Sequence, residues 1–221
     1  MLGNNSYVLF CWGGLVLKLF DNLSEKSREK KYKLFLDIIK PTKENTILDV
    51  GSGPGTFLEK RYINKENIIA LDINSEYLKD LKKKYPKVKT KLGSALKLPF
   101  EDNSIDIVFS NAVIEHIGNY KNQQQFAKEM QRVGKKWFVT TPNKWFPFEP
   151  HFLVPFYQFV PKKVQKFLSK HVNVGRYKKG TWQDINLISA RIFKKLFPTS
   201  KIMKNRITIF PETLICYGYK Q

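Results

Sequence analysis

Short apolar runs alternate along the chain with segments in which apolar residues recur every three or four positions. The first pattern is typical of buried strands and the second of helices. The predicted strands cover residues 46–50, 68–71, 88–92, 105–110 and 137–141. One predicted helix begins at residue 56, a second covers 75–84 with Ser75 as its N-cap, and a third covers 122–133. Strands that alternate with helices predict an α/β fold, with a mostly parallel sheet and helices on both of its faces.

Both ends of the chain add further elements. A charged helix begins at Glu25 and is ended by Pro41, because proline cannot continue a helix. The elements expected near the other end are a helix over 182–196 with Thr181 as its cap, and two antiparallel strands over 202–209 and 213–219.

Residues 143–180 interrupt the alternation with an aromatic and proline-rich stretch. After Pro161, phenylalanines and valines are interleaved with lysines, as in a basic amphipathic helix that either closes a cleft or lies on anionic lipid. A long insertion at this place is usually functional. The apolar run 7–20 is too short to span a bilayer, so it is either a packing helix or lid, or a contact with a membrane surface.

Composition and charge narrow the function classes. With 42% hydrophobic and 14% aromatic residues among 221, the chain can bury a real core, which excludes overall disorder. Its formal net charge of +20 favours an anionic partner: nucleic acid, an acidic membrane surface or a phosphorylated metabolite. Cys11 and Cys216 form no C-x-x-C pattern, so we expect no disulfide framework, no metal site and a reducing, cytoplasmic setting.

The sharpest motif is Gly51-Ser52-Gly53-Pro54-Gly55, directly after the first predicted strand. Such a turn lets a ligand approach the backbone where a Cβ would collide. It differs from the dinucleotide fingerprint, because Thr56 stands where the third glycine belongs, and no Walker lysine follows. Asp72, at the end of the second strand, can accept both hydroxyls of a ribose, and Asp49 can attract an ammonium group. Together these groups would bind S-adenosylmethionine.

These residues resemble the class I S-adenosylmethionine-dependent methyltransferases, in particular the small-molecule type with a short core, like methyltransferase domain 11. The resemblance continues through the segments 93–100, 103–108 and 110–117. It implies a Rossmann-like sheet of seven strands, mostly parallel, with a C-terminal antiparallel hairpin. It also implies S-adenosyl-L-methionine as the cofactor, S-adenosyl-L-homocysteine as its product, and no metal. The cofactor-binding residues expected from the motif and the resemblance are Asp49, Gly51, Ser52, Gly53, Gly55, Asp72, Ile73, Ser94, Ala95 and Asn111.

Several of these assignments rest on the resemblance alone. Ser94 stands where relatives commonly carry an aspartate for the adenine amino group, and the backbone of Ala95 supplies the other adenine contact. Ile73 would lie against the face of the adenine, and Asn111 would face the methionine end. The chain lacks the Asn/Asp-Pro-Pro-Tyr motif of enzymes that methylate base amino groups and the Pro-Cys nucleophile for cytosine C5. The comparison therefore favours O- or C-methylation of a small molecule.

Methyl transfer from a sulfonium is an in-line displacement, so the protein mainly aligns the acceptor with the methyl group and excludes water. A base helps only when the acceptor must lose a proton. His116 is the predicted catalytic residue because an imidazole titrates near neutral pH, and His151 is a second candidate. Glu149 and Tyr157 are further polar groups that could orient an acceptor in an otherwise apolar insertion.

We expect one methyltransferase domain over 1–221 that acts on a small acceptor, apolar or membrane-associated. Within it, 1–45 form a helical lid, 46–142 the cofactor-binding core, 143–180 an acceptor cap, and 181–221 the final helix and hairpin. Peripheral contact with an anionic membrane would fit the charge. The alternative is an RNA or tRNA methyltransferase or an RNA-binding protein, which scattered lysines and few arginines favour less. A cofactor-binding protein that has lost catalysis is the third possibility.

Overall fold

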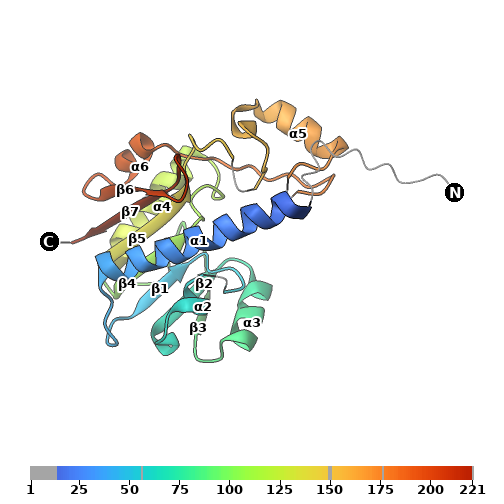
Figure 1. The fold of residues 1–221 in the computed structure, drawn as a ribbon. Coiled ribbons are helices and arrows are strands. Elements are labelled where there is room, and N and C mark those ends of the chain that lie inside the picture. The colour runs from blue at the N-terminus through green and yellow to red at the C-terminus, as the bar shows by residue number, and fades with distance from the viewer. Residues whose placement is uncertain (1–13, 56, 149–150, 176, 221) are drawn as a thin grey trace.

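A computed structural model describes residues 14–55, 57–148, 151–175 and 177–220. Residues 7–13 of the apolar run, with Cys11, lie outside this description, as do Thr56 and Glu149. The chain forms one seven-stranded sheet in the order β3-β2-β1-β4-β5-β7-β6 (Figure 1). The strands are β1 (Ile47–Val50), β2 (Ile68–Asp72), β3 (Lys89–Leu92), β4 (Ile105–Asn111), β5 (Gly134–Pro142), β6 (Lys201–Arg206) and β7 (Pro211–Tyr219).

Five strands of this sheet run parallel, and the last two form an antiparallel hairpin against β5. The predicted fold class is thereby confirmed. All four residues of β1 are buried, as expected for a strand covered on both faces. In β1, Asp49 lies opposite Ala70 of β2 and Phe109 of β4. The carboxyl ends of these three strands therefore meet at one edge of the sheet, where ligands bind in open α/β sheets.

Helices cover both faces of the sheet (Figure 1). The helices are α1 (Gly14–Ile39), α2 (Leu58–Arg61), α3 (Ser75–Lys84), α4 (Tyr120–Val133), α5 (Lys162–His171) and α6 (Ala190–Leu196), with 3-10 turns η1 (Lys65–Asn67) and η2 (Tyr157–Phe159). Side chains of α1, α2 and α3 pack with Ile47 and Phe109 on one face. Those of α4 and α6 pack with Leu48 and Val108 on the other. Adjacent strand residues thus supply two separate cores.

The helix predicted over 182–196 is wrong in its first half. Only α6 is helical, and its N-cap is Ser189, whose side chain accepts a hydrogen bond from the Ile192 N–H at 3.4 Å. Residues 181–187 are not helical, because Asn186 of this segment bonds elsewhere in the fold. The Asn186 N–H donates to the Glu115 carbonyl at 2.8 Å, and the Asn186 carbonyl accepts from Gln123 at 2.9 Å. Tertiary hydrogen bonds therefore replace the expected helical turn.

Two smaller predictions also need correction. The N-cap of α3 is Asn74 rather than Ser75: the Asn74 side chain accepts hydrogen bonds from the N–H groups of Glu76 and Tyr77. The strand predicted over 202–209 ends at Arg206, where the pairing of β6 with β7 shifts register.

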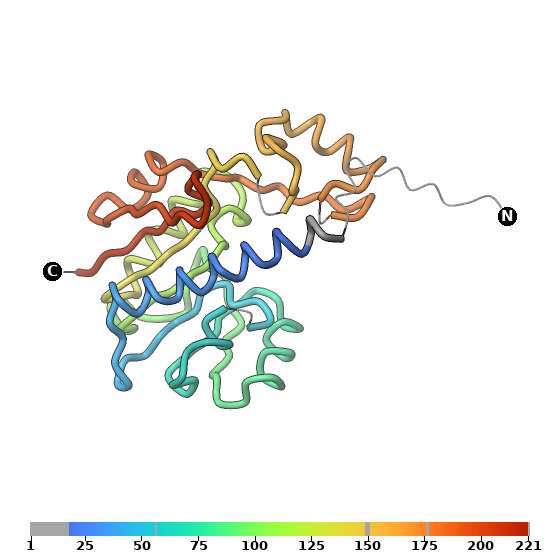
Figure 2. Tube along the Cα trace, viewed as in Figure 1, coloured from blue at the N-terminus to red at the C-terminus, as the bar shows by residue number. Residues whose placement is uncertain are grey.

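The insertion folds around its own small apolar cluster. Its members are Phe152, Val154, Tyr157, Val174 and Ile185. In Figures 1 and 2 the N-terminal part of α1 approaches this insertion, and the rings of Phe20 and Phe148 lie 5.6 Å apart. Across the described ranges, no helix is both long and apolar enough to cross a membrane.

Candidate functional site

The glycine turn after β1 is fixed by the end of β2. The N–H groups of Gly51 and Ser52 both donate to the Leu71 carbonyl, at 2.8 and 3.2 Å. Gly51 has a φ of +74°, and a Cβ at this position would lie 2.4 Å from a methyl group of Val113. Only glycine fits there, both because of the backbone angle and because of the close approach.

Gly53 and Asp72 face each other across the same edge. The Gly53 N–H donates to Asp72 Oδ2 at 2.9 Å, and the Asn74 N–H donates to Asp72 Oδ1 at 2.9 Å. A carboxylate offers about four lone-pair sites, so each Asp72 oxygen can accept a further bond. A Cβ built on Gly53 meets nothing within 4 Å, so open space lies over the turn. The structure thus brings together the two features predicted to hold a nucleoside.

Two carboxyl groups lie buried beneath the turn. Asp49 is 3% exposed and Glu59 of α2 is completely buried. Burial raises the pKa of Asp49 well above its ordinary value, and repulsion from Glu59 raises it further. Burial also raises the pKa of Glu59, and the contact with the Asp49 carboxyl group opposes this shift only in part. The pair therefore disfavours a double negative charge and favours a bound cation. Sequence analysis identified Asp49 but missed Glu59.

The residues expected around adenine lie along the edge beyond Asp72. Ile73 is 76% exposed and leaves an apolar surface next to the open turn. The Gly93 N–H donates to the Asp72 carbonyl at 3.0 Å, which holds Ser94 and Ala95 near this end of β2. The Ser94 hydroxyl accepts from the Leu96 N–H at 3.2 Å and so serves its own turn. The contacts of these residues with a nucleobase stay a prediction.

Asn111, at the end of β4, connects the edge of the sheet to α1. Its side-chain oxygen accepts hydrogen bonds from Thr140 at 2.8 Å and from the Lys31 ammonium at 2.9 Å. Burial lowers the pKa of Lys31 to about 8, and repulsion from Arg28 adds to this effect. Sequence analysis missed Lys31 among the many lysines. Its spacing of four and eight residues from Phe35 and Ile39, on the buried face of α1, is the pattern that would have found it.

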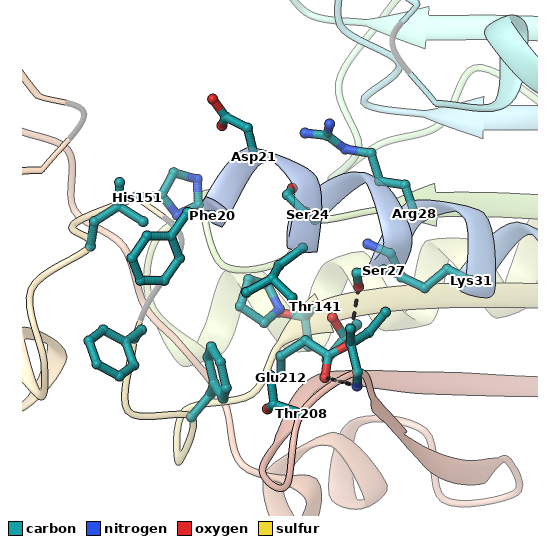
Figure 3. Close-up of a pocket in the computed structure, with 18 of the residues that line it drawn as sticks. Phe20, Asp21, Ser24, Ser27, Arg28, Lys31, Thr141, His151, Thr208 and Glu212 are labelled. Carbon is teal, nitrogen blue, oxygen red and sulfur yellow. Dashed lines mark hydrogen bonds between the residues drawn. The ribbon is translucent and has the colours of Figure 1, made fainter. Parts of the chain in front are cut away.

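A cavity of about 350 Å³ opens beside Asn111, between α1, the ends of β4 and β5, the insertion and the β6–β7 turn (Figure 3). Its apolar wall comprises Phe20, Leu23, Phe146, Phe148, Leu153 and Ile207. Its polar lining includes Asp21, Ser24, Ser27, Arg28, Lys31, Asn111, Thr141, His151, Thr208 and Glu212. The cavity thus has a mixed lining, in which aromatic and aliphatic side chains lie beside many polar and charged ones.

The two predicted bases occupy different places. His151 lines the cavity, whereas His116 does not belong to its wall. The two rings are 5.0 Å apart between centroids. His116 Nε2 lies 3.9 Å from the buried Glu115 carboxyl group, which accepts a hydrogen bond from Thr141 at 3.0 Å. The structure thus brings both histidines together but puts His151 nearer to any molecule in the cavity.

Residues 48–137 match a family model described as a methyltransferase domain. This segment, less than half of the chain, is therefore similar to the methyltransferase domain family. An uncharacterised methyltransferase of Schizosaccharomyces pombe is 36% identical over 92 residues, which cover 41% of this chain and 35% of the relative. A probable S-adenosylmethionine-dependent methyltransferase of Mycolicibacterium smegmatis is 32% identical over 101 residues, 44% of this chain and 38% of that protein. The chain thus spans little more than a third of these two methyltransferases.

The fold similarity covers more of the chain than the sequence similarity. A crystal structure of an S-adenosylmethionine-dependent methyltransferase from Methanosarcina mazei superposes with a TM-score of 0.62 at 15% identity, covering 81% of this chain and 94% of the other. At this identity the likeness concerns the fold. The methyltransferase domain family implies S-adenosylmethionine as its cofactor.

The residues at the sheet edge fit this cofactor. The open space over Gly53 leaves room for it, Asp72 has free acceptor sites for ribose hydroxyls, and the buried acidic pair at Asp49 suits an ammonium group. Among the described residues, no group of three or more histidine, cysteine, aspartate or glutamate side chains could hold a metal ion.

Proposed function

We propose that this chain transfers the methyl group of S-adenosylmethionine to a small acceptor held in the cavity between α1 and residues 143–180. The observation that carries this proposal is the position of Asn111 and Ala112, the last residue of β4 and the residue after it, which line the cavity. Val113, directly after them, packs against Gly51. A cofactor on the turn and a molecule in the cavity would therefore meet at this segment.

Each group at the sheet edge has a binding role in this proposal. The turn 51–55 supports the amino-acid part of the cofactor through its backbone, and Asp72 accepts the ribose hydroxyls. Ile73, Ser94 and Ala95 contact the adenine. The bound cofactor supplies an electrophilic methyl group on a sulfonium, and the protein aligns the acceptor with it and excludes water. Phe20 and Phe148, whose rings lie together on the cavity wall, serve the exclusion of water.

The acceptor that fits the cavity is largely apolar and is methylated on oxygen or carbon. The aromatic and aliphatic side chains on the cavity wall would contact its apolar part, and the polar and charged side chains beside them would orient its polar group. If the acceptor must lose a proton, His151 is the histidine on the cavity wall, and His116 stands behind it. His116 would then act by positioning His151 rather than by touching the acceptor.

The surface of the insertion favours an acceptor drawn from a membrane. In α5, Gln165 and Ser169 point inward and are buried, whereas Phe167 is 60% exposed and Val164 is 44% exposed. Trp145, Phe156 and Phe159 are exposed nearby in sequence, and the rings of Trp145 and Phe159 are 5.5 Å apart. α5 also carries Lys162, Lys163, Lys166 and Lys170. Exposed aromatic residues beside lysines are suited to an anionic lipid surface.

Liposome sedimentation tests this membrane contact. We expect binding to vesicles that contain phosphatidylserine at low salt and weaker binding for Phe159→Ser/Phe167→Ser. Binding should be unchanged for Ile63→Ser, which alters a still more exposed apolar residue far from α5 in sequence. Equal binding by all three proteins would contradict a specific role of α5. A tRNA titration with a measured salt slope separates the RNA alternative, because any protein of charge +20 binds RNA at low salt.

Calorimetry with S-adenosylhomocysteine tests the proposed function itself. We expect a saturable heat from the wild-type protein, followed by incorporation of labelled methyl groups when lipid, quinone, sugar and RNA extracts are offered as acceptors. Absence of S-adenosylhomocysteine binding would refute the proposed function. Binding without transfer to any extract would instead favour a cofactor-binding protein without catalysis.

A further inference from the structure

Lys31 is a buried cation without an ion pair among the described residues. Its side chain belongs to a residue that is 8% exposed, and its ammonium donates a hydrogen bond only to Asn111 within the part of the chain that the structure describes. No carboxylate oxygen of a described residue lies within 4.0 Å of it. A buried charge without an opposite partner is costly, so natural proteins usually supply one.

Two carboxylates attract Lys31 from a distance, but both are engaged elsewhere. Glu212 accepts hydrogen bonds from Ser27 at 3.1 Å, from Asn205 at 2.9 Å and from the Ile207 N–H at 3.0 Å. Glu115 accepts from Thr141, as described above. Neither acid neutralises the ammonium directly.

The surroundings of Lys31 explain why its pKa is lowered. Arg28 of α1 and Arg61 of α2 disfavour the charged form, whereas Glu115 after β4 and Glu212 of β7 favour it. Burial is the largest effect and lowers the pKa to about 8. An anion in contact with the ammonium would reverse this shift.

Lys31 also lies between the glycine turn and the cavity. Its ammonium lies 5.4 Å from the centre of the Phe57 ring, just after the glycine turn, and it lines the cavity together with Arg28. In Figure 3 both side chains project from the same helix, with Thr141 and Glu212 below it. One hydrogen bond to Asn111 leaves two donor hydrogens for a ligand on either side.

We propose that Lys31 is a binding residue for a carboxylate at the junction of the glycine turn and the cavity. Two sources offer this chemistry: the methionine carboxylate of the cofactor, and an acidic oxygen on the acceptor. The inference rests on the proposed function for the identity of these ligands. In either case the ligand supplies the negatively charged partner that the described residues do not give Lys31, and binding raises the pKa of Lys31.

Calorimetry with two nucleosides separates the sources. S-adenosylhomocysteine carries the carboxylate, and 5′-methylthioadenosine lacks the whole amino-acid group. If Lys31 binds the cofactor carboxylate, Lys31→Met lowers the affinity for S-adenosylhomocysteine about 10- to 100-fold, as expected for a lost charge-assisted bond. The affinity for 5′-methylthioadenosine is then unchanged. If it binds an acceptor oxygen, both nucleosides are unaffected, and Lys31→Met abolishes binding of an apolar monocarboxylate such as octanoate.

Two controls make the test specific. Lys31→Arg keeps the charge and should retain carboxylate binding, whereas Lys33→Met removes an exposed lysine of the same helix and should change nothing. Wild-type affinity for the carboxylate ligand should fall as pH rises above about 8, where Lys31 loses its proton, and that of Lys31→Arg should not. Unchanged affinity of Lys31→Met for both S-adenosylhomocysteine and octanoate would overturn the inference. Failure of the wild-type protein to bind either nucleoside would instead refute the proposed function, and octanoate would still test Lys31.

Discussion

The glycine turn and the cavity beside it are built in different ways. Backbone hydrogen bonds between the ends of neighbouring strands hold the turn, as between Gly51 and Leu71. The cavity is held by side chains from distant parts of the chain: Ser27 and Glu212 are 185 residues apart, and Lys31 and Asn111 are 80 apart. The first half of the site is therefore specified by local sequence, and the second by tertiary packing.

Two glycines test this comparison most severely. Gly51→Ala forces a left-handed backbone and a clash with Val113, at about 1–2 and 1–3 kcal/mol respectively, and we expect it to lower the melting temperature and to abolish S-adenosylhomocysteine binding. Gly175→Ala puts a Cβ 1.7 Å from the Phe152 carbonyl oxygen and should disrupt the insertion. Nucleoside binding should survive Gly175→Ala, because the turn does not depend on that segment. Loss of binding in both variants would show that the two halves fold as one body.

Asp72→Ala separates binding from stability within the turn. Loss of two charge-assisted bonds to ribose, at about 1.5–3 kcal/mol each, should lower the affinity for S-adenosylhomocysteine at least 100-fold, as measured by calorimetry. Loss of the acceptors for Gly53 and Asn74 should lower the melting temperature only modestly. Asp80→Ala, an exposed carboxylate on α3, is the control. A variant that binds as tightly as the wild-type protein would exclude Asp72 from the ribose site.

Glu59→Gln probes the buried acidic pair through pH. The pKa of Glu59 is raised in the folded protein, so its contribution to stability is present below its unfolded pKa, near 4, and is lost as pH rises through the folded value. Each tenfold difference in proton affinity between the folded and unfolded protein corresponds to about 1.4 kcal/mol of stability. We therefore expect Glu59→Gln to be more stable than the wild-type protein at pH 8 in urea denaturation, with a smaller difference at pH 5.

The matched control for this pH experiment is Glu66→Gln, which alters an exposed carboxylate close to Glu59 in sequence. It should show no gain at pH 8. Equal behaviour of the two variants would mean that Glu59 is ionised without penalty in the folded protein, and that the acidic pair is not a site for a cation.

The smallest expected effect concerns the helix whose start was predicted wrongly. Ser189→Ala removes the true cap of α6 and should lower the free energy of unfolding by about 1 kcal/mol. Thr181→Ala should have little effect, because within the described ranges this exposed side chain bonds only to the nearby Lys178 carbonyl. Chemical denaturation of both variants decides between the observed and the predicted helix start.

The sequence predicts the glycine turn and its neighbouring strands well, because their geometry is local. The bare turn at 51–55, the apolar strand before it and Asp72 after the next strand need nothing beyond their own residue types to indicate a nucleoside site. The helix start at Thr181 failed because a capping residue followed by helix-compatible positions is also compatible with an irregular segment, and the partners of Asn186 lie in other elements.

The cavity side of the site could be predicted only in outline. The aromatic insertion indicated an apolar acceptor, but no local pattern shows that α5 buries Gln165 and exposes Phe167. Lys31 is one cation among 39, and only its packing against the sheet distinguishes it. Residues whose roles depend on what they are packed against, rather than on what they are, escape sequence analysis.

The bridge from Ser27 to Glu212 also constrains how the molecule comes into being on the ribosome. α1 is synthesised before every strand of the sheet, and β7 after all the others. The hydrogen bond from Ser27 of α1 to Glu212 therefore cannot form until the final strand has been translated. The edge of the sheet proposed to bind the nucleoside comes earlier in the chain, whereas Glu212, the partner of Ser27 in α1, is still inside the exit tunnel. If the proposed function holds, a stalled nascent chain would bind the methyl donor before its acceptor cavity is complete.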